Sequence, residues 1–213
     1  MSILKIANMS VELVGYYGSD ETVANAARVS FHKGAENYTK EQNDKLIVYL
    51  AKHKHFSPFN HAFLSFRIKA PIFVGRQLVK HKFMPWNEVS RRYVDEEPEF
   101  YELMPRRRAE NIKQGSGDEL VPGIKMSHYG HEALEDYQDL LKMGVAPEVA
   151  RSVLPQNMMT EWIWSGTLGA FGDMLKLRLD PHTQHESREV AQKIYNIILQ
   201  HFPVSIDALI ESK

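Results

Sequence analysis

Apolar and polar residues alternate in two early stretches of the chain, and this alternation predicts two β-strands. The first stretch surrounds Val11 and Leu13 and ends at Gly15 to Gly18. The second stretch, His61–Lys69, alternates aromatic and β-branched residues with polar ones. A period of two residues is typical of a strand with one buried face.

Apolar residues spaced three and four positions apart predict helices along the rest of the chain. Thr39 and Gln42 form a capping-box pattern ahead of one such apolar face, and Pro71 suits the first turn of another helix. The predicted helices cover residues 21–29, a segment from about 40 that ends before Pro58, and residues 71–81, 125–143, a short stretch from 147, 168–179 and 185–200.

Early strands followed by later helices predict an α+β fold with a mixed or antiparallel sheet flanked by several helices. The length of 213 residues fits one domain, residues 1–213. Residues 104–124 are rich in proline, glycine and charge, so we expect a mobile insertion within that domain.

Composition narrows the chemistry that the chain can perform. It contains no cysteine, which excludes a thiolate nucleophile, an iron–sulfur cluster and a thiolate zinc site. Its net charge of −1 gives it no overall nucleic-acid or membrane character, so any anion must be held by a local cluster. The N-terminus lacks the basic start and apolar core of a signal peptide, and we expect a cytoplasmic protein without membrane partners.

The segment Arg76–Tyr93 is the strongest candidate for a functional site. It combines several cationic side chains with Trp86, Asn87, Glu88 and Ser90. Cationic groups suit a phosphate, whereas amides, hydroxyls and carboxylates suit the edge of a heterocycle. A solvated basic helix end followed by a turn is the alternative interpretation.

This segment resembles the signature of the flavin-dependent thymidylate synthases. The order Lys80-His81-Lys82, seven residues, then Ser90 is similar to the family pattern Arg-His-Arg, seven residues, Ser. Further segments resemble the family in the same order along almost the whole chain outside 104–124, at residues 27–31, 52–61, 69–77, 147–155 and 175–186.

The resemblance implies that the chain methylates dUMP to dTMP. In this family 5,10-methylenetetrahydrofolate donates the carbon, and FAD reduced by NADPH supplies the hydride. The lack of cysteine agrees with this, because the other class of thymidylate synthase adds a Cys thiolate to uracil C6. The family chemistry belongs to the cofactor, while the protein orients the reactants. The resemblance also implies a homotetramer with active sites shared between subunits.

Carried over by position, the resemblance assigns dUMP binding to residues that are mostly cationic: Gln77, Lys80, Glu88, Ser90, Arg91, Arg92, Arg151 and Arg178. Arg151 would meet the phosphate, since a planar fork matches phosphate oxygens. Arg178 would lie against the uracil and favour its N3-deprotonated form, a catalytic role.

The resemblance assigns FAD binding to Ser30, Ser57, Lys80, His81, Lys82, Glu88, Thr167, Gly169 and Asp173. His55 would stand near the flavin and folate rings, where we assign it a positioning role in catalysis. No metal is expected.

Several of these positions depart from the family pattern. The family usually has Asn, Arg and Asn near Thr167, Gly169 and Asp173, and often Glu at Asn60. Lysine at 80 and 82 is a point charge and does not make the bidentate contacts of arginine. We therefore expect weaker FAD binding than in close family members.

Three other functions compete with this interpretation. A pyrimidine nucleotide hydroxymethylase on the same scaffold would let water capture the transferred methylene. A metal-dependent hydrolase is suggested by the pairs His53/His55, His128/His131 and His182/His185, but no HExxH-like pattern is present. A nucleic-acid module is suggested by Arg106-Arg107-Arg108, which the sequence places in an acidic loop.

Restoring arginine at positions 80 and 82, on either side of His81, tests the expectation that FAD binds weakly. We predict that the double variant Lys80→Arg, Lys82→Arg binds FAD about tenfold more tightly, because one added charge-assisted hydrogen bond contributes about 1.5 kcal/mol. Titration followed by flavin fluorescence measures this change, with Lys142→Arg, outside the signature, as the control. Equal affinity of the double variant and the wild type would count against the prediction.

Overall fold

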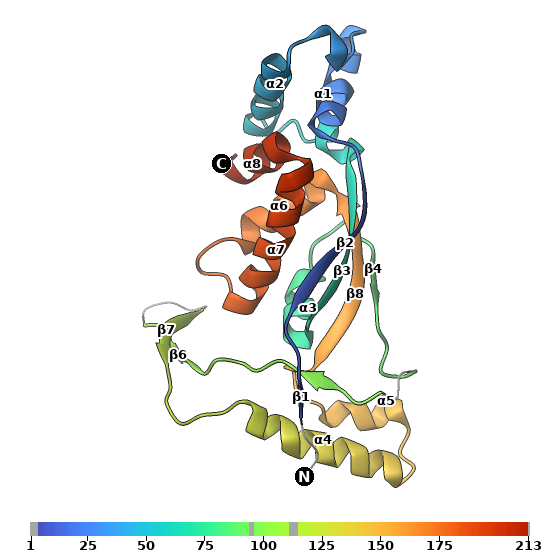
Figure 1. Ribbon diagram of the computed structural model, residues 1–213, viewed down its shortest axis with the longest axis vertical. Helices are drawn as coiled ribbons and strands as arrows, with labels where there is room; N and C mark the ends of the chain where they lie inside the picture. The colour runs from blue at the N-terminus through green and yellow to red at the C-terminus, as the bar shows by residue number, and fades with distance from the viewer. Residues whose placement is uncertain (1–3, 94–95, 111–114, 213) are drawn as a thin grey trace.

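A computed structural model describes residues 4–93, 96–110 and 115–212. Figure 1 shows the arrangement of its elements. The strands are β1 (Lys5–Ile6), β2 (Ser10–Tyr17), β3 (Phe63–Pro71), β4 (Trp86–Glu88), β5 (Glu99–Phe100), β6 (Arg106–Arg108), β7 (Ser116–Leu120) and β8 (Met159–Thr167). The α-helices are α1 (Asp20–Arg28), α2 (Lys40–Lys52), α3 (Ile72–Leu78), α4 (Ser127–Lys142), α5 (Pro147–Ala150), α6 (Leu168–Arg178), α7 (His185–His201) and α8 (Pro203–Glu211). Short 3-10 helices cover Val29–Phe31, Ala35–Asn37, Ser57–His61 and Arg151–Val153.

The central sheet has the strand order β2-β3-β8-β4, and its neighbouring strands are antiparallel. Strand β3 pairs with β8 from Phe63↔Thr167 to Pro71↔Met159. Alternate residues of both strands, including Phe66 and Trp164, are fully buried on the same face of the sheet. The period of two in the sequence of β3 therefore reflects one covered face, as predicted.

Helices α3, α6 and α7 lie on the same side of the sheet (Figure 1). The ring of Phe171 on α6 packs edge-on against Phe66 and Trp164, with centroids 5.1 and 5.5 Å away. Gly172 allows α8 to approach α6 closely, because a Cβ atom there would lie 2.8 Å from Leu209 Cδ1. The end of α6, which carries Arg178, is thus fixed by packing on both the sheet and α8.

A second, smaller apolar cluster lies away from the main core. It joins helix α4 to the paired strands β1 and β5 through Leu4, Phe100, Leu134 and Tyr137. In Figure 1 this cluster corresponds to the end of the molecule where the N-terminus lies.

The structure confirms the α+β class, the two early strands and the predicted helices. The sequence did not predict strands β4 and β8, helix α8 or the short strands β1, β5, β6 and β7. The predicted helix 71–81 ends at Leu78, and the residues after it form turns. Within the segment 104–124, β6 and β7 pair as an antiparallel hairpin, so this segment contains regular structure. Its mobility remains a prediction. No helix among the described residues is both long and apolar enough to cross a membrane.

Two leucines on α6 test the assignment of its buried face. Leu175 is fully buried, whereas Leu177 is 55% exposed. We predict that Leu175→Ala lowers the free energy of unfolding by about 2–5 kcal/mol, because the lost contacts leave a cavity. Leu177→Ala is the matched control and should change it by less than about 1 kcal/mol. Chemical denaturation measures both, and similar losses for the two variants would refute the assignment.

Candidate functional site

The end of α6 meets the end of α3 at Arg178. The Nε atom of Arg178 donates to His81 Nε2 at 3.1 Å, and Nη2 donates to the backbone carbonyl of Gln77 at 3.0 Å. Three residues predicted from sequence are thereby brought together, although Arg178 is about 100 positions from the other two. The antiparallel pairing of β3 and β8 accounts for this, since α3 follows β3 and α6 follows β8.

Burial sets the charge state of this group. Burial, and secondarily the charge of Arg178, lowers the pKa of His81 from 6.5 to about 4. Burial also lowers the pKa of Arg178, which nevertheless stays protonated as guanidinium groups do in proteins. Because Arg178 can only donate, His81 Nε2 is the acceptor and the ring proton lies on Nδ1. The group thus combines a fixed cation with a neutral imidazole.

A cavity of about 550 Å³ adjoins Arg178. It is lined by Gln77, Leu177, Arg178, Asp180, His182, Thr183 and Gln184, together with Gly115, which precedes β7. Among the described residues, no carboxylate forms an ion pair with Arg178. The cavity therefore offers a positive charge and amide groups to an anionic ligand, and its Asp180 carboxylate accepts from the His182 backbone amide at 2.7 Å.

A second cavity, of about 580 Å³, contains most of the residues predicted for FAD. It is lined by His81, Lys82, Thr167, Gly169 and Asp173, together with Phe56, Asn60, Phe83 and Ala170. His81 belongs to this cavity and also bonds to Arg178, so the two candidate sites are neighbours.

All the departures from the family pattern except Lys80 line this second cavity. Thr167 Oγ1 donates to Asn60 Oδ1 at 2.8 Å, and a Cβ atom at Gly169 would lie 2.6 Å from the same oxygen. Asn60, Thr167 and Gly169 thus form one local unit, in which the small residue leaves room for the amide. A lysine, hydroxyl and amide beside two phenylalanines fit a ligand that is both anionic and aromatic, as FAD is.

The remaining predicted FAD residues lie elsewhere. Ser30, His55 and Ser57 line a cavity of about 470 Å³ between α1 and α2. All three are exposed. The His55 backbone amide is fixed by the carbonyl of Leu50 at 2.9 Å. The exposed Lys80 makes no hydrogen bond or ion pair among the described residues.

Five predicted dUMP residues are separate from Arg178. The Glu88 carboxylate accepts from Thr160 Oγ1 at 2.7 Å and Trp86 Nε1 at 3.1 Å, at the sheet edge on β4. Ser90 Oγ accepts from the Arg92 backbone amide at 3.3 Å, and Arg91 bonds to the Glu96 carbonyl. The exposed Arg151 donates to the Glu148 carbonyl at 3.3 Å. Within the described chain, none of these side chains hydrogen-bonds to Gln77, His81 or Arg178.

Phe83 is a candidate that sequence reasoning missed. Its side chain is 91% exposed and its φ of 61° lies in the left-handed region, which a bulky residue rarely adopts. It lines the second cavity beside Lys82. The only signal in the sequence is an aromatic residue between two turn-forming segments of the signature.

The structure gives little support to a metal-dependent hydrolase or a nucleic-acid module. Within the described residues, no group of three or more histidine and acidic side chains could hold a metal ion. The triplet Arg106–Arg108 lies in strand β6, and not in a loop as predicted, because it pairs with β7. Arg106 forms an ion pair with Glu186, and Arg107 forms one with Glu119. These carboxylates neutralise positive charge that would otherwise attract the phosphates of a nucleic acid.

The lowered pKa of His81 predicts a pH dependence of stability. Since the folded-state pKa of about 4 lies below the ordinary value of 6.5, the unfolded state binds the proton more readily. Stability contributed by neutral His81 should be present above pH 6.5 and be lost as the pH falls towards 4. Melting temperatures measured across this range should decline less steeply for His81→Gln than for the wild type. Parallel curves would contradict the assignment.

A family model and the curated relatives point to the same protein family. Residues 12–204 match the family model described as thymidylate synthase complementing protein. The flavin-dependent thymidylate synthase of Kosmotoga olearia is 37% identical over 99% of this chain and 94% of its own length. That of Thermus thermophilus is 39% identical over 92% of this chain and 73% of its own.

A solved structure agrees with these relatives. The UMP/dUMP methylase PolB from Streptomyces cacaoi, bound with 5-Br dUMP, superimposes with a TM-score of 0.84 at 31% identity. The match covers 97% of this chain and 96% of that one. The chain belongs to the family of flavin-dependent thymidylate synthases.

Proposed function

We propose that this protein converts dUMP to dTMP, with 5,10-methylenetetrahydrofolate as the carbon donor and FAD reduced by NADPH as the hydride carrier. The observation that carries the proposal is the half-buried guanidinium of Arg178, held by His81 and the Gln77 carbonyl beside a polar cavity. The similarity to PolB, a UMP/dUMP methylase whose structure contains bound 5-Br dUMP, supports the same substrate.

Arg178 would act on the uracil ring. Uracil C5 is a weak nucleophile, and a fixed cation next to the ring favours the N3-deprotonated form, which is richer in electrons. Both acceptors of Arg178 in the protein are neutral, so its positive charge remains available to the base. Gln77 would add an amide hydrogen bond from the same cavity.

The cavity that contains Lys82 and Thr167 would hold FAD. When bound, FAD supplies the hydride that completes the methyl group. Lys82 would meet the pyrophosphate as a point charge, while Phe56 and Phe83 would cover apolar ring surface. Neutral His81 lies between the two cavities, where its Nδ1–H can donate without adding a second cation beside Arg178.

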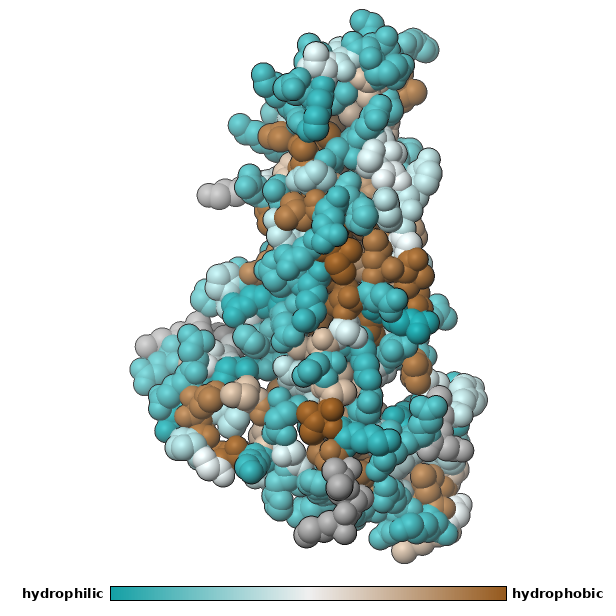
Figure 2. All heavy atoms as spheres, viewed as in Figure 1, coloured by the Kyte–Doolittle hydropathy of each residue, from teal (hydrophilic) through white to brown (hydrophobic). Residues whose placement is uncertain are grey.

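We also propose a cytoplasmic homotetramer in which active sites are shared. Arg151, Ser90 and Arg92 are expected to bind dUMP, yet in one chain they lie apart from Arg178. A second copy could bring these groups to the same nucleotide. Exposed hydrophobic side chains on β2 and β3, including Val14, Tyr17 and Phe63, support an assembly. Figure 2 shows hydrophobic residues gathered over these strands at mid-height.

Product mass tests the proposed reaction. We predict that incubation with dUMP, methylenetetrahydrofolate, NADPH and FAD gives a product heavier than dUMP by one CH₂ group. UMP serves as a parallel substrate because PolB is named as a methylase of both nucleotides. A product carrying one further oxygen would instead establish the hydroxymethylase, and unchanged dUMP would refute both.

A further inference from the structure

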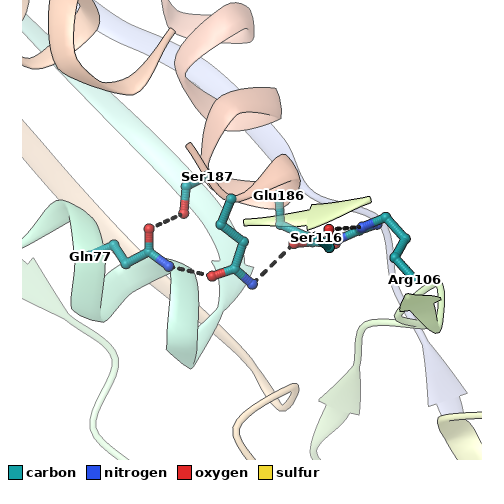
Figure 3. Close-up of polar contacts among 6 residues, drawn as sticks. Gln77, Arg106, Ser116, Glu186 and Ser187 are labelled. Carbon is teal, nitrogen blue, oxygen red and sulfur yellow. Dashed lines mark hydrogen bonds and ion pairs between the residues drawn. The ribbon is translucent and has the colours of Figure 1, made fainter. Parts of the chain in front are cut away.

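A relay of hydrogen bonds runs from Arg106 on the β6–β7 hairpin through Glu186 and Gln184 to Gln77 (Figure 3). Arg106 bonds to Glu186 through Nη2 and to Ser116 Oγ through Nε at 2.8 Å. The Glu186 carboxylate also accepts from Gln184 Nε2 at 3.2 Å.

The hydrogen-bond relay continues from Gln184 to the candidate nucleotide site. Gln77 Nε2 donates to Gln184 Oε1 at 2.5 Å, and Ser187 Oγ donates to Gln77 Oε1 at 3.0 Å. Glu186 and Ser187 belong to the first turn of α7, whereas Gln77 belongs to α3. The relay therefore connects three separate elements.

Glu186 fixes the direction of the hydrogen bonds that run through Gln184 and Gln77. Its side chain is 1% exposed and forms an ion pair with Arg106, and the oxygens of an ion-paired carboxylate only accept hydrogen bonds. Gln184 must consequently turn its NH₂ group towards Glu186 and its carbonyl towards Gln77. Gln77 must then turn its NH₂ group towards Gln184 and its carbonyl towards Ser187.

The fixed direction decides what Gln77 offers to a ligand. An amide nitrogen carries two hydrogens, and one of them is used by Gln184. The second hydrogen remains for an acceptor in the cavity that Gln77, Gln184 and Arg178 line together. With the opposite orientation, Gln77 would present a carbonyl and repel a nucleotide oxygen.

We propose that Glu186 is a positioning residue that orients the Gln77 amide through Gln184, so that Gln77 donates a hydrogen bond to an oxygen of the bound nucleotide. This inference rests on the proposed binding of dUMP. It assigns to the β6–β7 hairpin a part in the site, because Arg106 of β6 holds the buried carboxylate.

The variant Glu186→Gln tests the proposal. An amide at 186 can donate as well as accept, so it no longer imposes one direction on Gln184. We predict that the Kd for dUMP, measured by calorimetry, rises about tenfold, as expected for the loss of one hydrogen bond. The Kd for FAD should change by less than about twofold, because His81, Lys82 and Thr167 are untouched. The matched control is Glu189→Gln on the same helix, whose carboxylate forms a surface pair with Lys193 and should leave both constants unchanged.

A second background separates positioning from a general structural effect. If Glu186 acts through Gln77, then Glu186→Gln should have less than about a twofold effect on dUMP binding when Gln77→Ala is already present. A tenfold effect in that background would overturn the proposal. If the buried Arg106 left unpaired prevents folding of Glu186→Gln, the double variant Arg106→Gln, Glu186→Gln removes both charges and should show the same weakened dUMP binding. Unchanged dUMP affinity in a folded variant would also overturn it.

The outcomes also separate this proposal from the proposed function. If wild-type protein binds no dUMP, the proposed function fails. If wild-type protein and Glu186→Gln bind dUMP equally, the proposed function stands and only the role of Glu186 is refuted.

Discussion

The whole site depends on the desolvation of one cation. Arg178 is partly buried at the end of α6, where its guanidinium donates to two neutral acceptors, His81 and the Gln77 carbonyl. Removing a charge from water costs free energy unless an opposite charge compensates for it, and the described part of the chain supplies no carboxylate partner. The two hydrogen bonds of the guanidinium offset part of this cost, and an anionic ligand would lower it further. Burial, and secondarily the charge of Arg178, keeps His81 neutral, and the hydrogen bond between these two side chains links the nucleotide cavity to the flavin cavity.

The sheet is what makes this geometry possible. Strands β3 and β8 pair over nine residues each, so the helices that follow them lie on one face and bring their ends together. Trp162, Trp164 and Phe66 fill that face and fix the position of α3 and α6. The β6–β7 hairpin then adds a buried ion pair whose carboxylate gives direction to the amides of the cavity. The ion pair, the amides of the cavity and the Arg178–His81 pair are thus joined in one hydrogen-bonded network.

The sequence predicted the local features well and the long-range ones poorly. The alternation in β3 and the capping box at Thr39 are local signals, and both elements form where they were expected. Strand β8 carries the same alternation at Trp162, Trp164 and Gly166, but it was overlooked between two helical segments. The resemblance to the family identified Arg178, His81 and Gln77. No spacing in the sequence could indicate that Glu186 pairs with Arg106, because that contact depends on how the hairpin folds back onto α7.

The central claim is that Arg178 places its charge against the uracil of dUMP. The most direct measurement is the pKa of N3 in bound dUMP, obtained from ¹⁵N NMR of labelled nucleotide on the wild type and on Arg178→Gln. We expect a lower N3 pKa on the wild type than on the variant, because only the guanidinium stabilises the deprotonated ring. Equal N3 pKa values on two proteins that both bind dUMP would contradict this claim.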